Sequence, residues 1–305
     1  MRKKTMRIFV FAIAAMIVLG LLAGCGTKSE APVAEPPAET ETETATPAEP
    51  EEPVDEPADE PADESDLAYF QAQGTIKIGI TIFDPMNYFD DSGSLTGFDT
   101  DFAIALCKKL DLVPGFVEIN WDTKEIELAA KSIDCIWNGL TVTEERKKNI
   151  GFTDSYIKNM QVIVIRATDA DKYTSIDSLA DANLCAEMSS AGEDAIKDNP
   201  VLSGAAYTAM SKQTDTLMEV KTGASDAAVL DYTAAKALVG EGTSYSDLMI
   251  IPGTELEPEE YAIGLRVGSD AIPEFNKIIA ELIADGTLDA IAEKYDLTAS
   301  LLSNQ

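Results

Sequence analysis

The chain has 305 residues, which is enough for one large domain or two modest ones with appendages, and 45% of it is hydrophobic. Its formal net charge of -31 argues against a nucleic-acid or anionic-membrane surface, because phosphate groups would be repelled. The chain has no histidine, the usual general base near neutral pH and the commonest metal ligand, which argues against zinc hydrolases and Ser-His-Asp enzymes. We expect no metal and no cofactor.

The N-terminal segment has the pattern of a secretory signal. A basic stretch, residues 2–7, precedes an apolar run at residues 8–22. A transmembrane helix is the alternative, but the run is shorter than the roughly 20 apolar residues that span a bilayer. It ends in Leu22-Ala23-Gly24-Cys25, which resembles the bacterial lipobox. The resemblance implies that residues 1–24 are a signal peptide and that Cys25 carries lipid, which anchors the protein at the extracytoplasmic face of the cell membrane.

Residues 25–66 are dominated by Pro, Glu, Thr and Ala, with near-repeats of Asp-Glu-Pro-Ala. No core can form from this composition, and charge repulsion and proline both favour extended chain. We therefore expect a disordered acidic linker that acts as a spacer. A cation-binding arm is the alternative, although diffuse carboxylates on a flexible chain bind weakly.

From residue 67 onward, short apolar runs alternate with amphipathic ones, which is typical of an α/β fold with mainly parallel sheets. The first part predicts strands at 76–81, 115–119 and 133–137 and helices at 100–110 and 124–131. A second α/β unit predicts strands at 160–166, 183–187, 205–209 and 227–230 and helices at 192–197, 214–222 and 233–239. The final part predicts a strand at 261–267 and helices at 272–284 and 288–295. This order indicates two lobes with two crossings between them.

Three cysteines lie in this folded part: Cys107, Cys135 and Cys185. Their odd number and wide spacing do not fit a metal site, and we interpret all three as buried apolar residues. A disulfide between Cys107 and Cys135 stays open, since a helix and a neighbouring strand could bring them together.

Three stretches resemble the polar-amino-acid branch of the periplasmic solute-binding proteins. They are residues 95–101 (LTGFDTD), 138–148 (NGLTVTEERKK) and 152–156 (FTDSY). The resemblance covers nearly all of residues 67–305 and implies the type II fold, in which two α/β lobes joined by two hinge strands close on a ligand. Mapped on this chain, lobe 1 is residues 67–158 plus 262–305, and lobe 2 is residues 159–261.

A zwitterionic ligand needs a fixed cation for its carboxylate. Thr143 is a good helix N-cap and Arg146 lies three residues on, so the spacing predicts a guanidinium near a helix N-terminus, where an anion is favoured. From spacing alone, a solvated helix arginine is the plainer interpretation. The resemblance implies instead that Arg146 clamps the ligand carboxylate, assisted by Thr141 and the backbone at Gly139.

The turn Ser189-Ser190-Ala191-Gly192 precedes a predicted helix, and its small residues let backbone N–H groups approach an anion. In the family a similar turn completes the carboxylate site. Whether the Ser190 side chain or a backbone amide such as that of Ala191 does so here stays open, and a plain strand-to-helix turn is the alternative.

A zwitterion also needs a fixed anion for its ammonium group. Asp231 follows the strand at 227–230 and precedes the helix at 233–239, so it suits an N-cap. The stretch 226–232 resembles the second-lobe strand of the family, whose terminal aspartate pairs with the ligand ammonium. Both roles can coexist.

The remaining candidates concern the ligand side chain. Phe83 and Trp121 lie where the family places aromatic residues that sandwich the ligand, and core packing is the alternative for both. Glu187, at a strand end, and Asn138 are candidates for contacting the side chain, and a surface-facing strand end is equally compatible with Glu187. The family's acidic position for cationic ligands is Ile80 or Thr81 here, which weakens an assignment to lysine or arginine.

The resemblance implies a monomeric substrate-binding lipoprotein of an ABC importer, which binds an amino acid with a polar or cationic side chain and delivers it to a permease. It implies no enzymatic activity. A ligand-sensing receptor domain and an enzyme similar to cyclohexadienyl dehydratases are the alternatives. Without histidine, an enzyme would have only carboxylates such as Glu187, or lysines, as acid or base.

Overall fold

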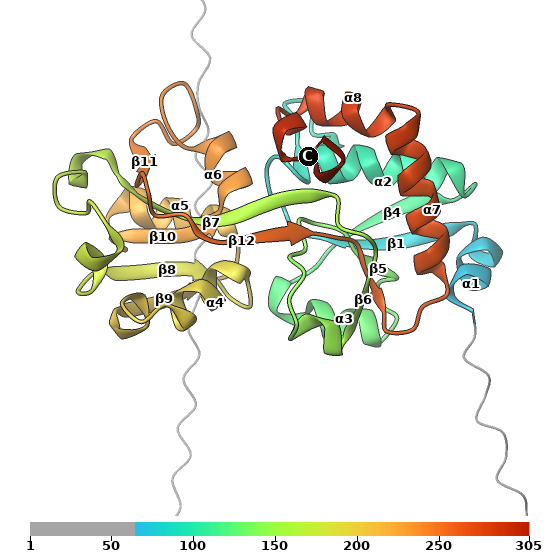
Figure 1. The fold of residues 1–305 in the computed structure, drawn as a ribbon, viewed down its shortest axis with the longest axis horizontal. Helices are drawn as coiled ribbons and strands as arrows, with labels where there is room; N and C mark the ends of the chain where they lie inside the picture. Colours follow the sequence, from blue (N-terminus) through green and yellow to red (C-terminus); the bar gives the residue numbers. More distant parts are fainter. Residues whose placement is uncertain (1–64, 305) are drawn as a thin grey trace, which may run out of the picture. The chain divides into compact units, whose positions relative to one another are not determined.

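The computed structural model describes residues 65–304, apart from the side chain of residue 257 (Figure 1). The predicted signal peptide, Cys25 and almost all of the predicted linker lie outside the described residues. Ser65 caps helix α1 (Asp66–Gln73) by accepting a hydrogen bond from Ala68 N, and Asp66 forms an ion pair with Arg266. Two residues assigned to the linker, Ser65 and Asp66, therefore take part in the folded structure.

The first lobe is built on a five-stranded sheet in the order β4-β1-β5-β13-β6. Strand β1 (Thr75–Ile80) pairs in parallel with β4 (Val113–Glu118) and β5 (Cys135–Ile136). Strand β13 (Gly264–Arg266), from late in the chain, pairs antiparallel with β5 and with β6 (Ile150–Phe152). The first lobe is therefore built from two separate parts of the chain, and β13 adds the later part to the sheet.

Helices cover both faces of this sheet. They are α2 (Phe98–Lys109), α3 (Lys124–Ala129), α7 (Ala271–Ala284) and α8 (Thr287–Lys294). In α2 the buried residues Phe98, Phe102 and Leu106 recur every four positions, so they form one apolar stripe that packs into the core. Two lysines in its last turn suit the negative end of the helix dipole.

The second lobe has a six-stranded sheet in the order β11-β7-β10-β8-β9, with β12 also paired to β7. The strands are β7 (Ile157–Arg166), β8 (Asn183–Glu187), β9 (Ala206–Met210), β10 (Ala227–Asp231), β11 (Leu248–Ile250) and β12 (Leu256–Tyr261). Helices α4 (Ala191–Asp198), α5 (Gln213–Thr222) and α6 (Tyr232–Leu238) pack on it. Strand β10 is buried along its whole length, which explains its unbroken apolar sequence before Asp231.

Two strands connect the lobes. β7 and β12 pair antiparallel from Ile157 opposite Tyr261 to Gln161 opposite Leu256, and both run from one sheet to the other (Figure 1). In α/β sheets the carboxyl ends of the strands are where ligands bind. β8 and β10 end in Glu187 and Asp231, so their carboxyl ends carry two of the predicted site residues.

Some predicted elements differ from the structure. The predicted strand at 261–267 contains β13, whereas β12 overlaps it only at Tyr261 and was otherwise missed; between the two strands Ala262 N donates to Leu140 O. The prediction missed α1, β6, β11 and the hairpin of β2 (Tyr88–Phe89) and β3 (Leu95–Thr96), all of which apart from α1 are too short to show a periodic pattern. Within residues 65–304, no helix is long and apolar enough to cross a membrane.

The three cysteines of the folded part are buried free thiols. Burial raises the pKa of Cys107 to about 12 and that of Cys185 to about 11, so neither forms a thiolate near neutral pH. The disulfide left open between Cys107 and Cys135 is absent, and the interpretation as apolar core residues is confirmed.

Candidate ligand-binding site

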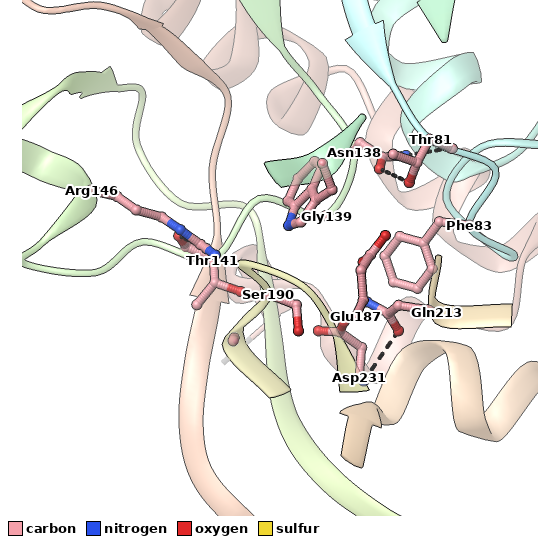
Figure 2. Close-up of a pocket in the computed structure, with 12 residues that line it drawn as sticks. Thr81, Phe83, Asn138, Gly139, Thr141, Arg146, Glu187, Ser190, Gln213 and Asp231 are labelled. Atoms are coloured by element: carbon pink, nitrogen blue, oxygen red, sulfur yellow. Dashed lines mark hydrogen bonds between the residues drawn. The ribbon is translucent and has the colours of Figure 1, made fainter. Parts of the chain in front are cut away.

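One pocket between the two lobes gathers the candidate residues (Figure 2). Twelve residues line it, and they include all ten that the sequence singled out together with Thr81 and Gln213. The first lobe contributes Thr81, Phe83, Trp121, Asn138, Gly139, Thr141 and Arg146, and the second contributes Glu187, Ser190, Ala191, Gln213 and Asp231.

Arg146 is buried at the edge of this pocket. Its Nη1 donates to Thr141 O at 2.8 Å, and its Nη2 donates to Ser189 O in the second lobe at 3.1 Å. Burial lowers its pKa, an effect that acidic neighbours led by Asp194 oppose. A guanidinium has five N–H donors, so N–H groups remain for an anion in the pocket.

The local structure at Arg146 differs from the prediction. Arg146–Lys148 form one turn of 3₁₀ helix, so no helix dipole of useful length points at the site. The prediction of Thr143 as N-cap is wrong, because Glu145 holds that position, but Thr143 Oγ1 does accept a hydrogen bond from Arg146 N at 3.1 Å. The favourable environment for an anion therefore comes from the guanidinium itself.

Gly139 occupies a position that only glycine fits. Its φ is +58°, and a Cβ there would lie 2.6 Å from Cε1 of the Phe83 ring. Its N–H donates to Asp99 Oδ2 at 2.7 Å, and Asp99 Oδ1 accepts from the Tyr156 hydroxyl at 2.7 Å. Burial raises the pKa of Asp99 to about 7, and the hydrogen bonds from Tyr156 and Gly139 oppose that rise. Asp99 thus fixes the backbone that leads to Thr141.

The side chain of Asn138 forms hydrogen bonds within the first lobe. Its Nδ2 donates to Thr81 O at 2.9 Å and to Asn87 Oδ1 at 2.7 Å, while its Oδ1 accepts from Thr81 Oγ1 at 2.7 Å. Both amide hydrogens are therefore used within the first lobe. Asn138 lines the pocket, but it has no hydrogen left to donate to a ligand side chain.

Asp231 is held by residues of both hinge strands. Its Oδ1 accepts from Asn159 Nδ2 at 2.6 Å, from Gln161 Nε2 at 2.9 Å and from the Tyr261 hydroxyl at 2.6 Å. Its Oδ2 accepts from Gln213 Nε2. Asp231 stands at the N-cap position of α6 but makes no side-chain capping bond, so the structure does not bear out the N-cap role.

A second carboxyl, that of Glu259, adjoins this group. Asn159 Nδ2 and Gln161 Nε2 each donate to Glu259 Oε1 as well as to Asp231. Burial and the neighbouring Asp231 charge raise the pKa of Glu259 well above its ordinary range. Of these two carboxyl groups, Asp231 lines the pocket.

The turn before α4 uses the Ser190 side chain as a cap. Ser190 Oγ accepts from Glu193 N at 3.2 Å, and Glu193 Oε2 accepts from Ser189 N at 2.8 Å. Ser189 takes the left-handed conformation, with φ +58°. Ser190 Oγ acts here as an acceptor, so its O–H hydrogen and the backbone N–H of Ala191 in the first turn of α4 can both donate toward an anion.

A buried lysine, Lys124, packs against one of the two aromatic residues of the pocket. Phe83 and Trp121 are both buried and both line the pocket. Lys124 Nζ lies 4.7 Å from the centre of the Trp121 ring and donates to Trp121 O and to Ser189 O, both at 3.0 Å. Burial, followed by the Arg146 charge, lowers the pKa of Lys124 to about 7.

The lobes are closed on each other. Ser189 O of the second lobe accepts from both Arg146 and Lys124 of the first, and Lys212 Nζ forms an ion pair with Glu118 at 2.6 Å. The pocket leaves a cavity of only about 10 Å³, close to the space for one water molecule. A ligand of amino-acid size must therefore enter when the lobes are further apart.

Sequence reasoning missed Gln213, Lys124 and the role of Asp99. Gln213 is the first residue of α5, next to the strand end that carries Asp231. From the sequence, Gln213 could not be distinguished from an exposed first residue of a helix. Asp99 lies within the LTGFDTD stretch, so a signal was present there, although its partner Gly139 is 40 residues away.

Within residues 65–304, no group of three or more Cys, Asp and Glu side chains could hold a metal ion. The pocket instead presents one guanidinium, two carboxylates, two aromatic rings and short polar side chains. This set can hold a small molecule that carries opposite charges at its two ends.

Comparison with known proteins agrees with this geometry. The family model for bacterial extracellular solute-binding proteins, family 3, matches residues 76–298. The chain belongs to this family. Among its relatives, the L-cystine-binding protein TcyJ of Escherichia coli is 29% identical over 226 residues, which cover 73% of this chain and 83% of TcyJ.

Solved structures of solute-binding proteins show the same fold. An ABC uptake transporter substrate-binding protein from Streptococcus pneumoniae with bound histidine superposes with a TM-score of 0.69, at 28% identity, over 77% of this chain and 97% of that one. An ancestral arginine-binding protein bound to arginine gives a TM-score of 0.68 at 31% identity, over 73% and 98% of the two chains. The predicted two-lobed type II fold is confirmed.

Proposed function

We propose that this protein is the substrate-binding lipoprotein of an ABC importer and that it carries an amino acid between its two lobes. One observation carries the proposal: a buried guanidinium from the first lobe and a carboxylate from the second, Arg146 and Asp231, line the same pocket. An amino acid zwitterion is the small molecule whose two charged ends match this pair at once. Relatives that bind cystine, histidine or arginine support the choice of an amino acid.

The contacts give each residue a role. Arg146 donates to the ligand carboxylate, and the N–H of Ala191 adds a further donor from the second lobe. Asp231 accepts from the ligand ammonium, with its orientation fixed by the hinge residues Asn159, Gln161 and Tyr261. Phe83 and Trp121 flank the side chain. Because the two charged ends are held by different lobes, ligand binding stabilises the closed state.

A thermal-shift screen of all twenty amino acids against the purified protein tests this function. A ligand that binds only the folded state stabilises it by RT ln(1 + [L]/Kd), about 2.7 kcal/mol at a hundredfold excess over Kd. We expect one amino acid, or a small related group, to raise the melting temperature. A screen in which none of the twenty does so would refute the function.

The lipid anchor and the importer are separate parts of the proposal. We expect the wild-type protein to fractionate with membranes and Cys25→Ser to be released from them, because a single cysteine carries the acyl chains. Uptake of the amino acid found in the screen should require this protein in cells.

The matched relatives are named as binding proteins, which favours a binding role over that of a dehydratase-like enzyme. Turnover of prephenate or arogenate by the purified protein would contradict it.

A further inference from the structure

Glu187 presents a carboxyl without a partner to the pocket. It ends strand β8, its side chain is 3% exposed, and its Oε1 is buried with no hydrogen-bond partner. Figure 2 shows it beside Gln213, between Asp231 and the Phe83 ring. Buried polar groups are almost always hydrogen-bonded, because an unpaired one costs about 1 to 3 kcal/mol, and more when it is charged.

The cations nearest to Glu187 are already committed elsewhere. Lys124 donates to Trp121 O and Ser189 O, and Arg146 donates to Thr141 O and Ser189 O. Both charges act on Glu187 only through space. Burial, with the Asp231 charge adding to it, raises the pKa of Glu187 to about 8. The second lobe therefore holds a buried acid that no described residue neutralises by direct contact.

The carboxylate and the ammonium group of an amino acid ligand do not supply a hydrogen-bond partner for Glu187 either. In the proposed function the ligand carboxylate binds Arg146 and the ammonium binds Asp231, so only the ligand side chain is left for Glu187. An apolar side chain would leave Oε1 unpaired, and the carboxylate of an acidic side chain has only acceptor oxygens and no hydrogen to donate to it. On the first-lobe side, the hydroxyl of Thr81 already donates to Asn138.

We propose that Glu187 is the specificity-determining residue of this pocket and that the ligand is an amino acid whose side chain ends in a nitrogen that donates hydrogen bonds. This rests on the proposed function and names its substrate class. A site built around a hydrogen-bond donor rejects analogues that lack the donor more strongly than an apolar pocket rejects a missing methylene.

Calorimetric titration with matched ligands tests this proposal. The pairs are glutamine against glutamate, lysine against norleucine and arginine against glutamate, so that each comparison removes the side-chain donor. We expect the best ligand to have a side-chain nitrogen and to bind at least about tenfold more tightly than its partner. Tightest binding by norleucine or glutamate would overturn the proposal.

Two substitutions of Glu187 sharpen the result. Glu187→Gln keeps one acceptor oxygen and should weaken binding of the best ligand by about tenfold, whereas Glu187→Met keeps the approximate length without an acceptor and should weaken it further. Glu219→Gln removes one acidic charge from α5 of the same lobe without touching the pocket and serves as the matched control. Unchanged ranking of the ligands in both Glu187 variants would also overturn the proposal.

The experiment separates this proposal from the function on which it rests. If no amino acid binds the wild-type protein, the function itself fails. If amino acids bind and require Arg146 but are not ranked by their side-chain donors, only the assignment of Glu187 fails. Circular dichroism of each variant shows that it is folded before the titration is interpreted.

Discussion

Replacing Arg146 should remove ligand binding while leaving the fold almost intact. Its side-chain hydrogen bonds go to carbonyl groups at the pocket, Thr141 O and Ser189 O, and it forms no ion pair within 4.0 Å among the described residues. Loss of one member of a buried, hydrogen-bonded charge pair costs about 2 to 5 kcal/mol of binding. Arg146→Ala should therefore raise Kd by roughly 30- to 5,000-fold.

Arg146→Lys separates charge from geometry. A lysine keeps the positive charge but cannot form two parallel hydrogen bonds to a carboxylate. We expect it to lose about 1.5 to 3 kcal/mol of binding, which is an intermediate weakening. Isothermal titration calorimetry gives the affinities, and urea denaturation of the ligand-free variants gives their stabilities.

Arg166 provides the matched control. It bonds Val220 O and Ser225 O and pairs with Asp169, all within the second lobe and away from the pocket. Arg166→Ala should therefore lower the free energy of unfolding without changing Kd of the folded fraction. Equal losses of stability and affinity in Arg146→Ala, or unchanged affinity in it, would refute the role of Arg146.

Three further predictions concern groups around the pocket and in the core. Asp99→Ala leaves both the N–H of Gly139 and the hydroxyl of Tyr156 without their acceptor, at about 1 to 3 kcal/mol each, and should lower the free energy of unfolding by roughly 2 to 6 kcal/mol in urea denaturation; Asp99→Asn, which keeps an acceptor, should lose less. The pKa of Glu187 rises from its ordinary 4.5 to about 8 on folding, so between these values the folded state holds a proton that the unfolded state releases. The wild-type protein should therefore lose stability relative to Glu187→Gln as the pH rises from 5 to 8. A stability difference that stays constant with pH would contradict this. Thiol titration without denaturant should label none of the buried cysteines within the folded lobes, and all should react after unfolding: Cys107, Cys135 and Cys185.

The fold was largely accessible from local patterns. Alternating apolar strands and amphipathic helices fixed the two α/β units, since each long element carries its own periodicity. The strand β8, for example, has the bounds that its apolar run predicts. The strands β6 and β12 escaped prediction, because β6 pairs with β13 and β12 pairs with β7, segments that lie roughly 100 residues apart in the chain.

The candidate site was accessible only in part. Sequence motifs singled out ten residues that line the pocket, but they did not show what each side chain does. The Ser190 hydroxyl turned out to cap α4, and the Asn138 amide is used within the first lobe. The supports of Asp231 come from the two hinge strands, which are separated from it by roughly 30 to 70 residues, so no local pattern could reveal them.

The bonds around Asp231 also connect the site with the hinge. Asn159 and Gln161 lie on β7, and Glu259 and Tyr261 lie on β12, the two strands that join the lobes. A ligand ammonium that binds Asp231 therefore acts on a group that both crossings hold. The arrangement gives a physical route from ligand contact to lobe closure.

The most direct test of the account is calorimetric titration with the amino acid that binds best and with two analogues of it. One analogue lacks the carboxylate and is the corresponding amine; the other lacks the ammonium and is the corresponding carboxylic acid. If Arg146 and Asp231 grip opposite ends of one zwitterion, each analogue should bind at least about a hundredfold more weakly, because each leaves one buried charge unpaired. Binding of either analogue as tightly as the amino acid itself would contradict the account.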